Sequence, residues 1–151
     1  MASEDFGILL ARAYIGFVEE LRRALAEMGF DDLHGSFGYV ARTLAEGPLT
    51  LRDLALRLGI TSQGALKIVD DMEENGYLLR AADPDDGRAK RLALTDKGKR
   101  ALAAARTIHR RFDRDLSRRM GAGKVAVGRA MLEAIVAQSV RDGRGAALRP
   151  I

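Results

Sequence analysis

Apolar residues recur at every third or fourth position along most of the chain, which is the period of an amphipathic helix. The first run ends at Gly29, and a second run ends before Pro48, because the residue before a proline disfavours the helical conformation. The apolar positions are Leu9, Leu10, Ala13, Tyr14, Phe17, Leu21, Ala24, Leu25 and Met28 in the first run, and Phe37, Val40, Ala41 and Leu44 in the second. The pattern predicts two helices, of which the first is long.

Two shorter helices are expected directly afterwards. Thr50 is placed to cap the first with Asp53 as the acid of a capping box, and Gly59 occupies the position of a left-handed C-cap. Thr61 caps the second, which ends at Gly76. The inward apolar positions are Leu51, Leu54, Ala55 and Leu58, then Ala65, Ile68, Val69 and Met72. Such a pair is typical of a helix-turn-helix, whose second helix can enter the major groove of DNA; a helical hairpin that only packs is the alternative.

The period then changes to two, which is typical of strands. The pattern predicts a strand from Tyr77 to Arg80, a turn rich in Asp, Pro and Gly, and a return strand from Arg91 to Leu94. The cations Arg88, Lys90 and Arg91 are expected at its tip, beside Asp83, Asp85 and Asp86. A basic hairpin after a helix-turn-helix indicates a wing that can reach phosphate or the minor groove. A solvated surface hairpin is the alternative.

The last third of the chain predicts two more helices, one from Asp96 past Met120 and one from Lys124 to Arg141. Their apolar stripes comprise Leu102, Ala105, Ile108, His109 and Phe112, then Val125, Met131, Leu132, Ile135 and Val136. Ordinary core accounts for most of these residues. The terminal helices nevertheless carry more apolar surface than a small head domain can cover, which indicates a partner, most simply a second copy. The tail "DGRGAALRPI" is expected to be frayed or loosely docked.

Composition narrows the classes of function. A chain of 151 residues that is 47% hydrophobic is expected to form one domain, residues 1–151. It has no cysteine and only two histidines, His34 and His109, so we expect no thiol chemistry, no metal site and no cofactor. Acidic and arginine residues interrupt the apolar run at its start, which predicts neither a signal peptide nor a membrane span, and we expect a cytoplasmic protein with no membrane partner.

The net charge of +4 is unevenly distributed along the chain. Residues 101–151 contain 11 Lys and Arg against 4 Asp and Glu, whereas residues 1–48 contain 4 against 8. A basic balance favours an anionic partner, although arginines along a long helix more often form a solvated face.

The run "GPLTLRDLALRLGITSQGALKIVDDMEENGYLLRAADPDDGRAKRLALTDKG" resembles the MarR family of bacterial winged-helix transcription regulators. Its most specific piece is "DPDDGRAKRLALTDKG", an aspartate-rich turn, a basic segment, and a strand that ends in Leu-Thr with a glycine three residues later. The resemblance implies a mainly α fold, a winged helix-turn-helix with a two-stranded β wing, flanked by long N- and C-terminal dimerisation helices. It places the DNA-binding lobe at residues 33–95 and the dimerisation helices at 4–29 and 96–141.

The same resemblance implies a homodimer that binds a palindromic operator in double-stranded DNA, as a repressor, with residues 61–73 as the recognition helix. Asp86 matches the wing aspartate and Arg88 the minor-groove arginine, and we expect Asp86 to hold the Arg88 guanidinium outward by a charge-assisted bond. In two respects the chain departs from the family. Gly87 stands where many relatives carry another arginine, and Lys67 is the one cation of a recognition helix rich in acids. The expected DNA-binding residues are Thr61, Ser62, Gln63, Leu66, Lys67, Asp86, Arg88 and Lys90.

In relatives, small aromatic or phenolic anions bind between the dimerisation helices and the DNA-binding lobe. The candidate effector-binding residues here are Tyr14, Phe17, His34, Phe37 and Phe112, with Tyr39 and His109 as further possible lining. Each is also explained as an ordinary core residue, and His34 as a neighbour of a helix N-cap.

Two other classes of function are alternatives for this sequence. A winged helix can serve as a protein-interaction or dimerisation module, in which case Gln63, Lys67 and Arg88 are surface residues without a role in DNA binding. An enzyme is not expected, since the sequence suggests no Ser-His-Asp arrangement, no glycine-rich phosphate loop after a strand and no paired carboxylates in an apolar setting.

Overall fold

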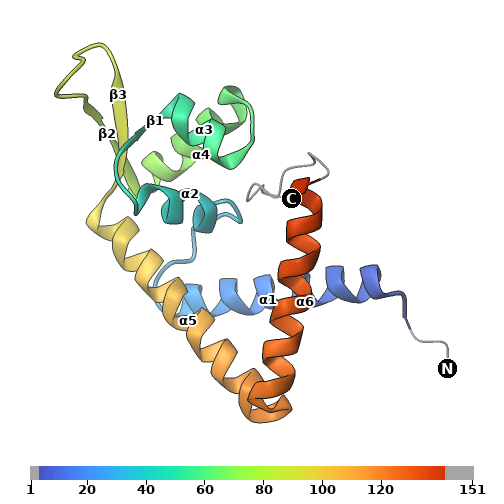
Figure 1. Cartoon of the computed structure of the whole chain (residues 1–151). Coiled ribbons are helices and arrows are strands. Elements are labelled where there is room, and N and C mark those ends of the chain that lie inside the picture. The colour runs from blue at the N-terminus through green and yellow to red at the C-terminus, as the bar shows by residue number, and fades with distance from the viewer. Residues whose placement is uncertain (1–3, 142–151) are drawn as a thin grey trace.

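The computed structural model describes residues 4–141, and over this range the expected mainly helical architecture is confirmed (Figure 1). In chain order the elements are α1 (Phe6–Glu27), α2 (Phe37–Leu44), β1 (Leu49–Thr50), α3 (Leu51–Leu58), α4 (Ser62–Glu74), β2 (Leu78–Ala82), β3 (Lys90–Leu94), α5 (Asp96–Met120) and α6 (Ala122–Arg141). The tail from Asp142 onward, for which fraying was expected, lies outside the described residues.

Threonine side chains begin three of the helices. The hydroxyl oxygen of Thr50 accepts the Asp53 amide at 3.1 Å, that of Thr61 accepts the Gly64 amide at 3.0 Å, and that of Thr95 accepts the Gly98 amide at 3.1 Å. Each bond satisfies an N–H that has no partner inside the helix. Gly59 ends α3 with φ 67°, as expected of a left-handed cap. The helix-turn-helix formed by α3 and α4 is therefore confirmed.

The wing belongs to a three-stranded antiparallel sheet with the order β1-β3-β2. The expected two-stranded wing is present in β2 and β3, which begin or end one or two residues away from the expected positions. The strand β1 was not expected, because two residues are too short to show a period. It pairs Leu49 with Leu92 and so closes the sheet onto the start of α3.

One apolar core holds α2, α3, α4 and the sheet together with the first turns of α5. Its buried residues are Phe37, Val40, Ala41, Leu44, Leu54, Leu58, Val69, Met72, Tyr77, Leu78, Leu92, Leu94, Ala101 and Leu102. Tyr77 precedes β2 and is one of the largest fully buried side chains, although it was expected as the first strand residue. The helix pair and the wing are thus fixed to each other as one lobe.

The long helices lie outside this lobe. Figure 1 shows α5 running away from it and α6 turning back beyond Gly121, whose φ is 90°, so that the two helices form a V. α1 packs on α5 through a second small cluster of Leu25, Ala104 and Ala105. Large apolar side chains are exposed on both terminal helices, namely Phe6, Ile8, Leu9, Leu10, Tyr14 and Ile15 on α1 and Val127, Met131, Leu132, Ile135 and Val136 on α6. The single chain does not cover this surface.

Candidate DNA-binding interface and ligand cavity

The two faces of α4 differ sharply. Ala65, Val69 and Met72 point into the core and are buried. On the other side, Ser62, Gln63, Leu66 and Lys67 are exposed within the first two turns, with 40% of Leu66 accessible. Thr61 is also exposed, but its hydroxyl is occupied by the helix cap. The start of α4 therefore presents a hydroxyl, an amide, an apolar group and a cation to an approaching surface.

The acidic end of α4 is partly neutralised by a residue that the sequence interpretation missed. Arg80 of β2 bonds the Asp70 carboxylate at 2.6 Å and also pairs with Glu73. The hydrogen bond that Arg80 donates to Asp70 is the main cause that raises the pKa of Arg80, and the charge of Glu73 adds to it. Arg80 stands two positions after the buried Leu78, so the period of the strand already places it on the side facing the helix.

The base of the wing turn is held by a carboxylate. Asp83 is only 8% exposed, accepts the Asp85 amide at 2.9 Å and accepts the Arg91 Nε at 2.7 Å. The hydrogen bond from the Asp85 amide is the main cause that lowers the pKa of Asp83, and the hydrogen bond from Arg91 is the second. The expectation that Arg91 lies at the wing tip is therefore wrong, because its side chain is engaged at the base of the turn.

The tip carries Asp86, Arg88 and Lys90, all exposed. Asp86 Oδ1 accepts the backbone amide of Arg88 at 3.0 Å. The expected bond from Asp86 to the Arg88 guanidinium is not formed between these described residues, because a carboxylate two positions before an amide closes an Asx turn with that amide instead. Asp86 shapes the backbone of the turn and leaves the Arg88 side chain exposed.

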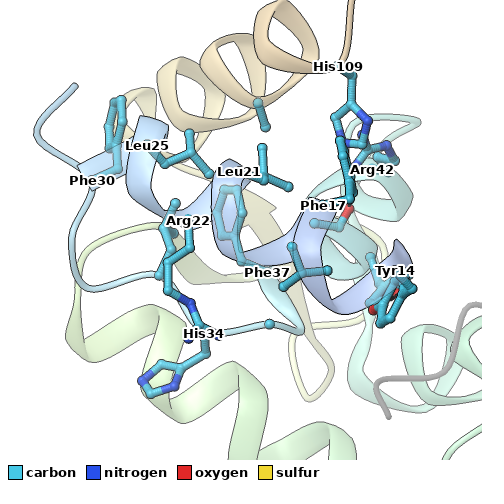
Figure 2. A pocket seen from close by; sticks show the side chains of 16 residues that line it. Tyr14, Phe17, Leu21, Arg22, Leu25, Phe30, His34, Phe37, Arg42 and His109 are labelled. Atoms are coloured by element: carbon cyan, nitrogen blue, oxygen red, sulfur yellow. Dashed lines mark hydrogen bonds between the residues drawn. The ribbon is translucent and has the colours of Figure 1, made fainter. Parts of the chain in front are cut away.

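A cavity of about 340 Å³ lies between α1, the segment that follows it, α2 and α5 (Figure 2). Of the expected effector-binding residues, Tyr14, Phe17, His34 and Phe37 line it, together with Tyr39 and His109. Phe37 is only 3% exposed and belongs mainly to the core. Phe112 does not line this cavity. Its ring packs edge-on against the Phe17 ring, with 4.8 Å between the ring centres, and it borders a separate hollow of about 180 Å³ between α1 and α5.

The polar groups of the cavity include a residue that the sequence interpretation did not single out. Arg42 of α2 lines the cavity and donates from Nη1 to the Gly38 carbonyl at 3.2 Å. Burial and then the nearby Arg106 lower the pKa of Arg42. The hydroxyl oxygens of Tyr14 and Tyr39 lie 3.2 Å apart and form a hydrogen bond. Burial is the main cause that raises the pKa of Tyr39 to about 12, and this hydrogen bond is the second. Helical spacing links Tyr39 to Arg42 and could have drawn attention to the arginine.

The segment between α1 and α2 is tied to the lobe that contains α4 and the sheet. Tyr77 donates its hydroxyl hydrogen to Asp32, and Lys97 Nζ lies 3.3 Å from the same carboxylate and 4.3 Å from the centre of the Tyr77 ring. The Tyr77 hydrogen bond is the main cause that lowers the pKa of Asp32. His34 Nε2 lies 3.4 Å from the Asp71 carboxylate of α4. The wall of the cavity thus contacts the end of α4 directly.

Two negative findings bear on other classes of site. Within residues 4–141 no group of three or more histidine, aspartate or glutamate side chains is arranged to hold a metal ion. Every helix within this range is too short or too polar to span a lipid bilayer.

Comparison with known proteins agrees with this geometry. The model of the MarR family matches residues 37–89, from α2 to the wing. The chain is 33% identical over 101 residues to YkoM of Bacillus subtilis, an uncharacterized HTH-type transcriptional regulator, in a match that covers 67% of this chain and 64% of YkoM. The chain belongs to the MarR family.

Other known proteins extend the likeness. A putative transcriptional regulatory protein for the hcr operon of Thauera aromatica is 31% identical over 87 residues, which is 57% of this chain and 52% of that protein. The chain therefore spans about half to two thirds of the length of these curated relatives. The solved structure of the transcriptional repressor CouR bound to a 23-mer DNA duplex has 27% identity and a TM-score of 0.70, covering 87% of this chain and 92% of CouR.

Proposed function

We propose that this MarR-family chain is a transcriptional regulator that binds double-stranded DNA through α4 and the wing. The observation that carries the proposal is the exposed start of α4 on the same lobe as the wing tip, which exposes the cations Arg88 and Lys90. A relative with the same fold, CouR, was solved on a DNA duplex. Residues 33–95 form the DNA-binding lobe in this proposal, and such a regulator acts in the bacterial cytoplasm, where its operator is.

Three exposed residues at the start of α4 have matching groups in the major groove. The Gln63 amide can pair with the adenine edge by two hydrogen bonds, Leu66 can contact a thymine methyl, and Lys67 can reach guanine or phosphate. In this proposal Thr61 and Ser62 lie beside the phosphate backbone of the DNA. The acids at the other end of α4 keep that end away from phosphates, even with Arg80 paired to two of them.

The regulator acts as a homodimer in this proposal, with residues 4–29 and 96–141 as dimerisation helices. Exposed apolar side chains on α1 and α6 support it, because a closed two-fold dimer would bury them. Two symmetric lobes call for an inverted-repeat operator with half-site centres about one helical turn apart. As a repressor, the dimer would be released when a small aromatic or phenolic effector fills the cavity beside α2.

Binding to duplex DNA as a function of salt is the experiment that tests the function. The full chain is used to select fragments from genomic DNA, and a selected duplex is then titrated at several salt concentrations. We expect tight binding that weakens linearly with the logarithm of salt, since phosphate contacts release counterions. No selected sequence and no salt-dependent binding would support the alternative, a winged-helix module for protein interaction.

Gln63→Ala is expected to relax base preference at one position in each half-site. Losing two hydrogen bonds to one base costs about 1 to 3 kcal/mol of binding free energy. The measurement is sequence selection with the variant beside the wild type, and the control is Arg52→Ala, an exposed change on α3. If the variant selects the same sequences with the same stringency, Gln63 does not contact a base.

Arg88→Ala is expected to weaken DNA binding strongly, because an exposed wing arginine suits a narrow A·T-rich minor groove. The slope of log K against log salt should fall by about 0.9 if a phosphate contact is lost with it. Asp86→Ala should also weaken binding, since the Arg88 amide loses its acceptor. If only the net charge mattered, removal of the negative charge of Asp86 would instead strengthen binding to DNA.

Asp85→Ala provides the matched control for this wing prediction. It removes the same charge one residue away, but the Asp85 contact in the turn is made by its backbone amide. We expect binding to duplex DNA that is unchanged or tighter for Asp85→Ala and weaker for Asp86→Ala, measured at two salt concentrations. Equal tightening by both variants would show that Asp86 has no positioning role.

A further inference from the structure

Basic side chains converge at one end of the cavity. Figure 2 shows Arg42 from α2 and His109 from α5 at this end, and the two are close enough for the charge of Arg42 to affect His109. Arg106, one turn before His109 on α5, adds a third basic group that acts on Arg42. No ion pair between Arg42 and a carboxylate is formed within residues 4–141, and the contact of its guanidinium is the neutral Gly38 carbonyl.

The surroundings of this cluster are apolar. Phe17, Leu21, Leu25 and Phe37 line the cavity beside it, and the His109 ring lies 5.0 Å from the Phe17 ring. A half-buried cation without a counter-charge is disfavoured in such surroundings. A ligand that brings one negative charge on an aromatic body would satisfy the cation and fill the apolar space.

His109 meets charged or titratable groups from each element packed around it. α1 presents the Tyr14 hydroxyl to the cavity, and α2 presents Tyr39 and Arg42. On α5, Asp113 lies one turn further along, and its carboxylate is 3.2 Å from Arg129 of α6. Burial first, and Arg42 second, lower the pKa of His109, against a smaller opposing effect of Asp113. In the free protein the imidazole is therefore neutral at neutral pH.

An anion on Arg42 reverses this balance. It cancels the repulsion between Arg42 and a protonated His109, and it offers the imidazolium a negative partner, which favours the charged form. We propose that the aromatic effector assigned to this cavity, bound as an anion, brings one proton with it: Arg42 holds the anionic group and His109 takes up the proton. The inference rests on the proposed function, because it concerns the cavity assigned there to the effector.

The sign of the pH dependence follows from the two states of His109. At a pH below the pKa of His109 in the free protein, His109 is already protonated before the ligand binds, and the affinity for the ligand is highest. At a pH above the pKa of His109 in the complex, His109 is neutral in both the free and the bound protein, and the affinity is lowest. Between the two values, affinity falls by up to about tenfold for each pH unit. An aryl carboxylate stays ionised throughout this range, so the ligand contributes no change of its own.

Calorimetry of the full chain with 2-naphthoate as the probe tests the proposal, with 2-naphthamide as its neutral counterpart. At one pH, the titration is repeated in buffers that differ in ionisation enthalpy. We expect the carboxylate to bind at least tenfold more tightly than the amide, and the heat of binding to vary with the buffer in the sense of proton uptake. Absence of carboxylate binding at millimolar concentration, or equal binding of both probes, overturns the anionic site.

Two variants locate the groups. His109→Gln should still bind 2-naphthoate, but without proton uptake and without the fall in affinity as pH rises. Arg42→Gln should lose the preference for the carboxylate over the amide. Equal heats in all buffers for the wild type, or uptake that survives His109→Gln and disappears in His34→Gln, overturns the assignment to His109. No DNA is present in these titrations, so their outcome is independent of whether the chain binds an operator.

Discussion

Gly98→Ala is expected to destabilise the chain by about 3 kcal/mol, at the upper end of what overpacking a core costs. Gly98 lies in the first turn of α5, where a Cβ atom would sit 2.0 Å from the Tyr77 carbonyl oxygen. That oxygen is backbone and cannot turn away, and it also accepts the Thr95 amide at 3.1 Å. Relief of the clash therefore requires α5 to move off the lobe.

Chemical denaturation followed by circular dichroism measures this effect. The matched control is Gly123→Ala in α6, where an added Cβ meets no atom within 4 Å. We expect the control to be as stable as the wild type or up to about 1 kcal/mol more stable, because alanine favours a helix over glycine. A Gly98→Ala midpoint equal to that of the control would mean that α5 can leave Tyr77 at no cost, and the packing described for this junction would be wrong.

Gly98 also shows where sequence reasoning succeeds and where it stops. In the sequence, its position three residues after Leu-Thr has meaning only through the likeness to the family. The local part of its role, the amide that bonds the Thr95 cap, follows the same rule as the caps at Thr50 and Thr61 that were predicted. The packing against Tyr77, 21 positions earlier, could not be predicted because no local pattern records which backbone a helix will touch.

The candidate site also combines features that local sequence patterns predict with features that depend on contacts between distant residues. The helices, their caps and the exposed face of α4 follow from periods and cap residues, which act over a few positions. The strand β1 depends on pairing with β3, more than 40 positions later, and left no pattern of its own. Phe112 shares a helical stripe with His109, but it lies nearly one turn further along α5 and so reaches the Phe17 ring outside the cavity.

Charge contacts were the least predictable part. Arg42 and His109 are 67 positions apart, and only the packing of α2 on α5 brings them to one cavity. At the wing the expected partner of Asp86 was the guanidinium of Arg88, whereas the residue bonds the amide. Side-chain torsions decide between two acceptable partners of one carboxylate, and the order of residues does not fix them.

Met131→Glu combined with Ile135→Glu is expected to convert the proposed dimer into a monomer and to weaken binding to the full operator by about 10²- to 10⁴-fold. Met131 is 46% exposed and Ile135 39%, and they stand one turn apart on α6. Four charges in a two-fold apolar contact, two from each chain, face one another without counter-ions. Light scattering gives the mass of the particle, and fluorescence anisotropy gives the affinity for operator DNA.

Ala126→Glu combined with Ala137→Glu is the matched control, since both alanines are exposed and lie on the opposite side of α6. It adds the same charge to the same helix and should leave mass and affinity unchanged. Binding to a DNA duplex that carries only one half-site distinguishes a loss of dimerisation from a loss of DNA recognition. Because α6 contributes no residue to the core that joins α4 and the wing, the Met131/Ile135 variant should bind one half-site as the wild-type lobe does, and lose only the gain from binding two at once. A variant that stays dimeric, or a monomer with undiminished affinity for the full operator, would contradict the proposal that α6 joins two lobes on one operator.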